Sequence, residues 1–198
     1  MKATLVLSTI ALFAGAATAD DIFRSSFESG PDGFVGTGDW ELGTPNGFDG
    51  APFGGPEPVG GATGDFAWGT VIGGAHSAST TSVLSRQFSF AGFTDVAMSF
   101  AEWLDSGGNT FDMAMVSVNG DQLYLADGGP TNGWRTVDLD LSAYDGLADV
   151  TVEFTFITTS VVERVGWYVD DVAITGVPTP ASAALLGFAG LAATRRRR

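Results

Sequence analysis

The chain has 198 residues, 44% of them hydrophobic, which is enough for one well-filled domain and too few for two of ordinary size. It contains no cysteine, so thiol catalysis, disulfide bonds and cysteine-ligated zinc are excluded. Between residues 20 and 176, four arginines and no lysine stand against all 23 acidic residues. This charge argues against nucleic acid as a partner, because affinity for phosphate backbones comes from clustered Lys and Arg.

The N-terminal residues have the order of parts of a secretory signal peptide. Lys2 precedes an apolar run over residues 3–16, and the small residues of Ala17-Thr18-Ala19 stand directly before Asp20. The sequence therefore predicts export, with residues 1–19 as the signal peptide. A buried N-terminal helix is the alternative interpretation of the same apolar run.

Residues 177–198 combine a proline pair, an apolar segment and a basic end. The apolar segment is about 14 residues long, short of the roughly 20 that a simple membrane-spanning helix needs. The residues that give this tail its pattern are Val177, Pro178, Thr179 and Pro180 at its start, and Arg195, Arg196, Arg197 and Arg198 at its end.

This tripartite tail resembles the PEP-CTERM sorting signal of Gram-negative bacteria, with Thr179 in place of the family's glutamate. The resemblance implies an exosortase-type processing enzyme as a partner and transient anchoring of the tail in the inner membrane. It also implies a final location in the cell envelope, on the outer surface or in the extracellular matrix. A C-terminal anchor helix that is never processed is the alternative.

The remaining residues, 20–176, are expected to form one β domain. Apolar residues alternate with polar ones, as in half-buried strands, over residues 84–90, 96–100, 111–115, 137–141 and 150–156. In the third of these stretches, Phe111, Met113 and Met115 are predicted to form the inward face. Asn119-Gly120 predicts a tight hairpin. We therefore expect an all-β antiparallel sandwich of jelly-roll, concanavalin-like type, flanked by the signal peptide and a short C-terminal apolar helix.

Residues 30–74 differ from the rest of the domain. Fifteen of these 45 residues are glycine, so most of the segment is predicted to be long loops over one end of the sandwich. Its six Phe and Trp residues indicate loops that pack against the domain. Loops of this kind are where a binding surface is expected.

The order of landmarks resembles the MAM-like and "choice-of-anchor" jelly-roll domains of bacterial surface proteins. The residues that carry the resemblance are Phe27-Glu28-Ser29-Gly30, Trp40-Glu41-Leu42-Gly43, Met98-Ser99-Phe100-Ala101-Glu102-Trp103 and Gly166-Trp167-Tyr168-Val169-Asp170-Asp171-Val172. The resemblance implies a non-catalytic adhesion or binding module, and related jelly rolls hold a structural calcium ion.

A calcium site is expected from Glu28, Asp170 and Asp171. The first and last strands of a jelly roll are usually neighbours, so these carboxylates can converge, and a cation relieves their repulsion. Asp170 and Asp171 point to opposite faces of a regular strand, and Asp170 is preferred as the ligand because it shares the face of Tyr168 and Val172. Solvated surface carboxylates are the alternative.

Catalytic and sugar-binding residues are harder to assign. His76 is the only histidine and no Gly-x-Ser-x-Gly motif accompanies it, which favours a loop histidine over a catalytic one. Glu102 and Asp105 form the nearest carboxylate pair, without a glycosidase pattern around them. Four aromatic residues are candidates for stacking on sugar rings if their faces are exposed, with burial as the default: Trp40, Trp68, Tyr124 and Tyr144.

Three functions follow from these features. The first is an exported, non-enzymatic adhesion or structural protein that meets surface proteins. The second is a calcium-stabilised carbohydrate-binding module that acts on exopolysaccharide. The third, least favoured, is a secreted hydrolase. The sequence predicts no catalytic residue and no cofactor other than Ca²⁺.

Overall fold

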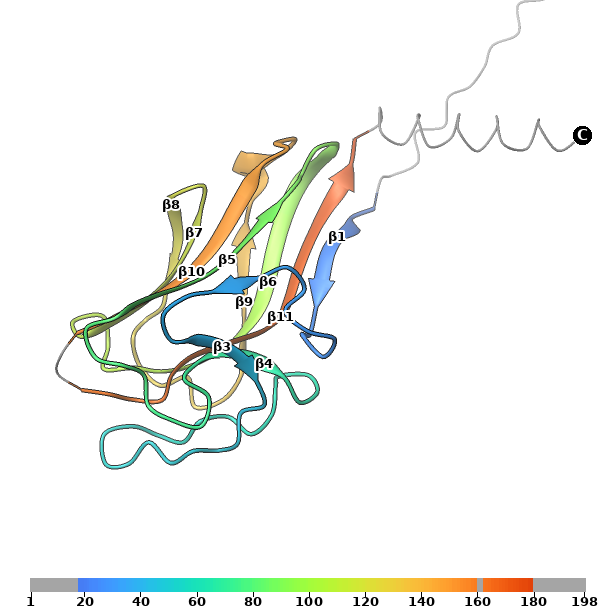
Figure 1. The fold of residues 1–198 in the computed structure, drawn as a ribbon. Coiled ribbons are helices and arrows are strands. Elements are labelled where there is room, and N and C mark those ends of the chain that lie inside the picture. Colours follow the sequence, from blue (N-terminus) through green and yellow to red (C-terminus); the bar gives the residue numbers. More distant parts are fainter. Residues whose placement is uncertain (1–17, 160–161, 180–198) are drawn as a thin grey trace, which may run out of the picture.

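The computed structural model describes residues 18–159 and 162–179, which form two antiparallel β-sheets packed face to face (Figure 1). Sheet A has the order β3-β4-β11-β6-β9, with β1 also paired to β11, and sheet B has the order β2-β5-β10-β7-β8. The strands are β1 (Asp20–Ser25), β2 (Val35–Gly36), β3 (Trp40–Gly43), β4 (Ala67–Thr70), β5 (Thr81–Phe88), β6 (Phe93–Asp105), β7 (Asp112–Val118), β8 (Asp121–Leu125), β9 (Arg135–Asp140), β10 (Val150–Thr158) and β11 (Gly166–Pro178). The predicted all-β antiparallel sandwich is confirmed.

The central strand of sheet B has the alternation expected from its sequence. Val150, Val152, Phe154 and Phe156 are fully buried, while the residues between them point to the outer face. Phe154 meets Phe100 of β6 edge-to-face, with 5.1 Å between ring centroids, so its ring joins the two sheets. The hairpin predicted at Asn119-Gly120 connects β7 to β8, and both residues have positive φ.

The inward face predicted for residues 111–115 is wrong by one residue. Ala114, Val116 and Val118 of β7 face the core, whereas Met113 and Met115 are half-buried on the outer face and Phe111 is exposed. A shift of one residue turns a whole strand over. The reason is the neighbouring strand: in the register of β10 with β7, Phe154 lies opposite Val116 and Phe156 opposite Ala114, so small residues fill the space beside large rings.

Arg86 interrupts the apolar pattern of β5 because it covers one open side of the sandwich. Its guanidinium lies 3.9 Å from the ring centroid of Phe23 on β1 and 4.8 Å from that of Phe88. β1 belongs to sheet A and β5 to sheet B, so this cation–π contact bridges the sheets where their backbones do not pair.

Glu102 of β6 closes the opposite side. This fully buried carboxylate accepts hydrogen bonds from the Tyr124 hydroxyl on β8 at 2.5 Å, from Arg135 Nε on β9 at 2.7 Å and from Trp167 Nε1 on β11 at 3.0 Å. Because β8 and β9 are the edge strands of the two sheets on this side, the carboxylate joins both edges to the centre of sheet A. Burial of Tyr124 and its bond to Glu102 raise the pKa of this phenol.

The two ends of the described chain lie side by side. Asp20 pairs with Gly176, and β11 continues through Val177 to Pro178, which pairs with Phe93, so the sandwich extends two residues past the expected boundary at 176. The predicted signal peptide up to residue 17, the apolar C-terminal helix, Pro180 and the four terminal arginines lie outside the described residues. Within the described ranges, no helix is long and apolar enough to cross a membrane.

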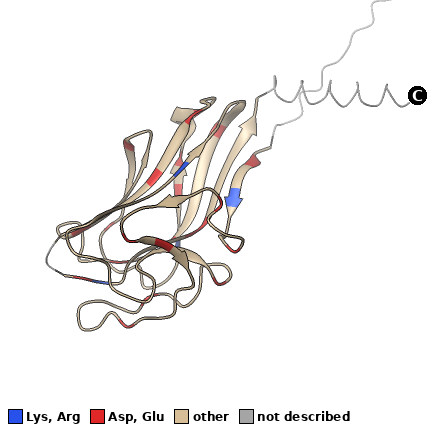
Figure 2. Cartoon of the chain, in the orientation of Figure 1, with Lys and Arg blue, Asp and Glu red and all other residues tan. Residues whose placement is uncertain are grey.

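The glycine-rich loops gather at the other end of the sandwich (Figure 1). Residues 44–66 between β3 and β4, residues 71–80 between β4 and β5, and the connection from β10 to β11 meet there. The packing predicted for the aromatic residues of 30–74 holds for Phe34, Trp40 and Trp68, which are buried, but not for Phe53 and Phe66, which are 63% and 39% exposed. Acidic residues are spread over these loops and both sheets, with few basic residues among them (Figure 2).

Candidate functional site

Buried carboxylates hold the loops at this end. Glu57, 2% exposed, accepts hydrogen bonds from the backbone N–H of Phe48 and of Gly73, each at 2.9 Å, and from the Tyr168 hydroxyl at 3.2 Å. One side chain thus joins two loops to β11. Burial raises the pKa of the Tyr168 phenol, and the neighbouring charge of Glu57 raises it further. Loops tied at several points keep their shape without a ligand.

Asp105, at the end of β6, is a second buried carboxylate that holds these loops in place. It accepts a hydrogen bond from the Gly55 N–H at 2.7 Å and pairs with Arg164 at 3.1 Å, and its side chain is 2% exposed. A side chain at position 54 would collide with it, because a Cβ on Gly54 would lie 2.5 Å from Asp105 Oδ2. Glycine is therefore needed where this loop crosses the carboxylate.

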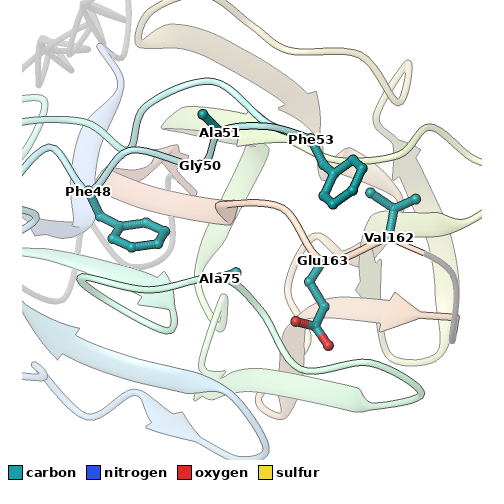
Figure 3. A pocket seen from close by; sticks show the side chains of 7 residues that line it. All are labelled: Phe48, Gly50, Ala51, Phe53, Ala75, Val162 and Glu163. Carbon is teal, nitrogen blue, oxygen red and sulfur yellow. The ribbon is translucent and has the colours of Figure 1, made fainter.

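The loops enclose a pocket of about 280 Å³. Its lining residues are Phe48, Gly50, Ala51, Phe53, Ala75, Val162 and Glu163. Figure 3 shows the rings of Phe48 and Phe53 on two sides of the hollow and the Glu163 carboxylate on a third. We call this the loop-end pocket. Two aromatic rings and one carboxylate around an open hollow can both stack on a flat apolar surface and accept hydrogen bonds.

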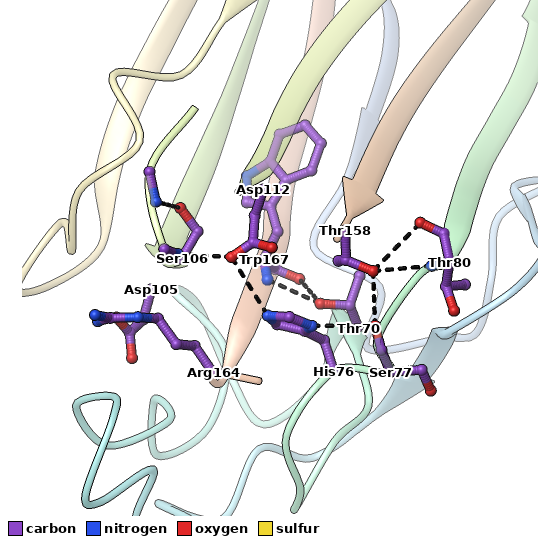
Figure 4. Close-up of polar contacts among 12 residues, drawn as sticks. Thr70, His76, Ser77, Thr80, Asp105, Ser106, Asp112, Thr158, Arg164 and Trp167 are labelled. Carbon is purple, nitrogen blue, oxygen red and sulfur yellow. Dashed lines mark hydrogen bonds and ion pairs between the residues drawn. The ribbon is translucent and has the colours of Figure 1, made fainter. Parts of the chain in front are cut away.

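A buried polar cluster lies next to this pocket (Figure 4). His76, 1% exposed, pairs with Asp112 with 3.6 Å between Nε2 and Oδ2, and both side chains are fully buried. The backbone N–H of His76 donates to the carbonyl of Arg164 at 2.8 Å, which links the loop 71–80 to the residues before β11. Since Ala75 and Glu163 adjoin these two residues in sequence and line the pocket, the cluster supports the pocket wall.

The groups around His76 favour its charged form. Burial alone lowers the pKa of His76, but the Asp112 carboxylate, the Ser77 carbonyl and the charge of Asp39 together raise it above its ordinary value. No serine or threonine hydroxyl of the described residues bonds to its ring, which contacts Ser77 through the backbone carbonyl only. The loop histidine expected from the sequence is thus a buried ion-pair partner.

The aromatic residues named as candidate sugar contacts are mostly in the core. Trp40, Trp68 and Tyr144 are 5%, 6% and 7% exposed and pack between the sheets, so they offer no open ring face. Tyr124 is half-buried, and its hydroxyl is bonded to Glu102. Trp40, Trp68 and Tyr144 are part of the hydrophobic core, whereas Tyr124 only packs against it.

The structure brings all three predicted metal ligands to one loop, and two of them bind its backbone. Glu28 Oε1 accepts hydrogen bonds from the N–H groups of Asp65 and Phe66 at 3.0 and 2.8 Å. Asp170 Oδ2 accepts from Ala62 and Thr63 at 2.7 and 3.1 Å. The two carboxylates therefore bind neighbouring backbone groups of residues 61–66.

Asp171 reaches the same loop through a side-chain hydroxyl, and β11 bulges at this point. Asp171 has φ of 48°, and the pairing of β11 with β6 shifts between Asp170 and Ala173. The bulge leaves Asp170 on the side of Tyr168, as expected, but turns Val172 and Ile174 to the opposite, core side, so the predicted shared face of Asp170 and Val172 is wrong. The Asp171 carboxylate accepts a hydrogen bond from the Thr63 hydroxyl at 2.6 Å.

The oxygen atoms around Gly61 are of the kind that coordinates a hard cation. A Cβ on Gly61 would lie 2.5 Å from the Phe66 carbonyl oxygen, 2.7 Å from Asp170 Oδ2 and 3.0 Å from the Thr63 carbonyl oxygen. Oxygen ligands alone are what Ca²⁺ takes, six to eight of them. Among the residues described, no three His, Asp or Glu side chains form a metal-binding group. Backbone carbonyls would therefore have to complete any calcium shell here.

The carboxylate pair considered for hydrolysis does not face an open cleft. Glu102 is fully buried between the sheets and bound by three donors, and Asp105 is engaged by Gly55 and Arg164. Neither carboxylate lines the loop-end pocket.

Sequence reasoning missed Phe48, Phe53 and Glu163. Phe53 follows a proline and precedes two glycines, so it has no strand alternation that would bury it. A large aromatic residue in such a loop is a usable signal for an exposed ring, whereas the approach of Glu163 to residues 48–53 depends on tertiary structure alone.

Searched against protein-family models, the chain matches none. Bacillopeptidase F of Bacillus subtilis (strain 168) is 28% identical over 161 residues, which is 77% of this chain and 10% of the relative. The chain thus spans about a tenth of the length of the curated relative that it matches.

Solved structures share the fold at low sequence identity. The carbohydrate-binding module TmCBM61, solved with β-1,4-galactotriose, has a TM-score of 0.53 and 12% identity, over 78% of this chain and 97% of the module. The K1 cleaved adhesin domain of Lys-gingipain from Porphyromonas gingivalis W83 has a TM-score of 0.51 and 15% identity, over 79% of this chain and 97% of that domain. The two-sheet sandwich is therefore one that binding modules and adhesin domains use.

Proposed function

We propose that this protein is an exported, non-enzymatic carbohydrate-binding domain of jelly-roll type that holds a polysaccharide at its loop-end pocket. The observation that carries the proposal is the exposed ring of Phe53 beside Phe48 and Glu163 around one hollow. The fold shared with a galactotriose-binding module supports the class of function without assigning the sugar.

The chemistry of the pocket suits a sugar ring. The C–H face of a pyranose is apolar and stacks on an aromatic ring such as Phe53, while its hydroxyls need hydrogen-bond acceptors such as the Glu163 carboxylate. The loops are held in place by Glu57 and Asp105, so little conformational entropy is lost when a ligand binds.

The charge of the domain selects among polysaccharides. The span 20–176 carries 23 acidic residues and four arginines, and Figure 2 shows acidic residues on the loops of the pocket end. Anionic chains such as polyuronates would be repelled, so the proposed ligand is a neutral exopolysaccharide.

The placement of the two ends agrees with anchoring at the envelope. Asp20 and Gly176 pair at one end of the sandwich, while the loop-end pocket lies near the start of the long strand β11, at the other end (Figure 1). If residues 177–198 attach the protein to the envelope through an exosortase-type enzyme, the pocket points away from the membrane. This orientation supports a matrix or adhesion role for the bound glycan.

A calcium ion is part of the proposal. Asp170 and the carbonyls of Thr63 and Phe66 would hold it, with Glu28, which lies beside Gly64, as a further candidate ligand, and it would fix residues 61–66 on sheet A. Calcium then acts on stability rather than in the pocket, because none of these residues lines it.

Affinity electrophoresis of the full chain through gels containing single polysaccharides tests the proposal. Retardation by a neutral polysaccharide that falls in Phe53→Ala, but not in the exposed loop variant Val59→Ala, is expected. In EDTA, a lower melting temperature with retained binding would support the structural calcium ion. Equal migration in all gels would overturn the carbohydrate function and leave protein adhesion as the better account.

A further inference from the structure

A second hollow lies on the outer face of sheet A. It has a volume of about 580 Å³, which lies within the range of ordinary ligand pockets and exceeds that of the loop-end pocket. Its side-chain groups come from β1, β6, β9, the bulge of β11 and the loop 61–66: Arg24, Ser99, Ala101, Thr136, Asp171 and Thr63. It shares no residue with the loop-end pocket. We call it the sheet-A trough.

The floor of the trough is made by small residues. Ser99 and Ala101 point outward from β6, and Thr136 lies opposite Ala101 on β9. Larger side chains at these three positions would fill the space. Because these three neighbouring side chains are short, a channel is left over β6 and the edge strand β9.

The β11 bulge directs a carboxylate toward this channel. In a regular strand Asp171 would point to the core side, opposite to Asp170, but its positive φ and the register shift turn it outward. The Thr63 hydroxyl then fixes the carboxylate at 2.6 Å. Bulges that re-aim a side chain in this way are frequent beside binding sites.

The polar groups of the trough complement a molecule that both donates and accepts hydrogen bonds. Arg24 only donates, Asp171 only accepts, and the hydroxyls of Ser99 and Thr136 do both. Arg24 is already paired with Asp21, at 3.1 and 3.0 Å, so the Asp171 carboxylate beside this pair and the acidic domain around it repel anions. The matching chemistry is that of an uncharged polyol.

An aromatic pair lies directly beyond the trough. Trp103 is two residues past Ala101 on the same face of β6, which is about 7 Å along the strand. Its half-buried ring meets Trp134 edge-to-face, with 6.1 Å between centroids, and neither indole belongs to the core cluster. A sugar chain that lies along β6 would reach from the polar trough to an indole surface.

We propose that the sheet-A trough is a second binding site, for a neutral oligosaccharide lying along β6 toward Trp103. It goes beyond the loop-end function because it adds an independent site on another face. Two sites on one domain allow binding of neighbouring segments or chains, which strengthens attachment without any new contact at either site.

NMR titration of the full chain with xylohexaose, β-1,4-galactotriose and cellotriose tests this inference. At least one probe is expected to shift the amide signals of Ser99, Ala101 and Thr136. Asp171→Asn keeps a residue that tolerates positive φ and should weaken this binding about tenfold, as expected for a lost charged hydrogen bond. The matched control Glu153→Gln removes a carboxylate from the outer face of sheet B and should leave binding unchanged.

The outcomes separate the two sites. Shifts confined to residues 48–53 and 163, or an Asp171→Asn variant that binds as well as the original protein, would overturn the trough while leaving the loop-end proposal standing. Shifts confined to the trough would support this inference and overturn the loop-end proposal. No shift at the trough with any of the three probes would overturn the inference.

Discussion

Glu28 and Asp170, from opposite ends of the domain's sequence, accept hydrogen bonds from adjacent stretches of the same loop, residues 62–63 and 65–66. Glu57, Asp105 and Asp112 likewise accept hydrogen bonds from backbone N–H groups of other loop residues. The acid-rich composition therefore serves the interior as well as the surface: carboxylates satisfy backbone N–H groups that glycine-rich loops leave without partners.

Loss of the Asp170 carboxylate should destabilise the protein. Asp170→Ala removes the acceptor for Ala62 and Thr63 at a fully buried position, so the free energy of unfolding should fall by about 3 kcal/mol. Urea denaturation measures the change. Asp127→Ala, at an exposed position, is the control, and equal midpoints for the two variants would contradict this role for Asp170.

Stability should fall as the pH rises through the folded-state pKa of His76. The folded-state pKa of His76 lies above 6.5, its ordinary value, so its stabilising charge is fully present below pH 6.5 and is lost as the pH rises through the folded pKa. The groups facing it are Asp112, Asp39, the Ser77 carbonyl and the Phe156 ring. Unfolding free energies measured between pH 6 and pH 9, flanking that ordinary value, should decline in the original protein and stay flat in His76→Gln. A decline of the same size in the variant would show that another group is responsible.

Removal of Glu102 should be among the most damaging single changes. Glu102→Ala leaves Arg135, Tyr124 and Trp167 without their shared acceptor between the sheets, at a cost of about 3–5 kcal/mol. Thermal unfolding followed by tryptophan fluorescence measures it. Glu153→Ala, on the outer face of sheet B, should change the free energy of unfolding by less than about 1 kcal/mol. Similar melting temperatures would argue against the joining role of Glu102.

The register of β7 can be tested with two neighbouring substitutions. Ala114→Asp places a charge in the core beside Phe156 and should prevent folding, whereas Met115→Asp places it on the outer face and should be tolerated. Soluble yield and circular dichroism of the two variants distinguish them. If Met115→Asp prevented folding and Ala114→Asp were tolerated, the inward face predicted from the sequence would be correct.

The sequence predicts strands well where large apolar residues alternate on the core side, as in β10 and in residues 96–100 of β6. It fails at β7, because the inward residues are small, while the strongly hydrophobic methionines lie half-buried on the outer face. The neighbouring phenyl rings that select Ala114 and Val116 come from a strand distant in sequence.

The candidate sites were only partly accessible to sequence reasoning. The convergence of Glu28 and Asp170 on one loop follows from the pairing of β1 with β11, which the order of strands suggests. The bulge at Asp171 and the approach of Glu163 to Phe53 depend on tertiary contacts that no local pattern records. The burial of Trp40, Trp68 and Tyr144 likewise depends on which side of each strand meets the other sheet.

Isothermal titration calorimetry of the full chain and of Phe53→Ala with neutral oligosaccharides tests the central claim most directly. The original protein should bind at least one of xylohexaose, β-1,4-galactotriose and cellotriose, and loss of the exposed ring should weaken that affinity about tenfold while the melting temperature stays the same. Val59→Ala should behave like the original protein. Binding that is unaffected by Phe53→Ala, or no heat of binding with any of the three sugars, would contradict the claim that the loop-end pocket holds a carbohydrate.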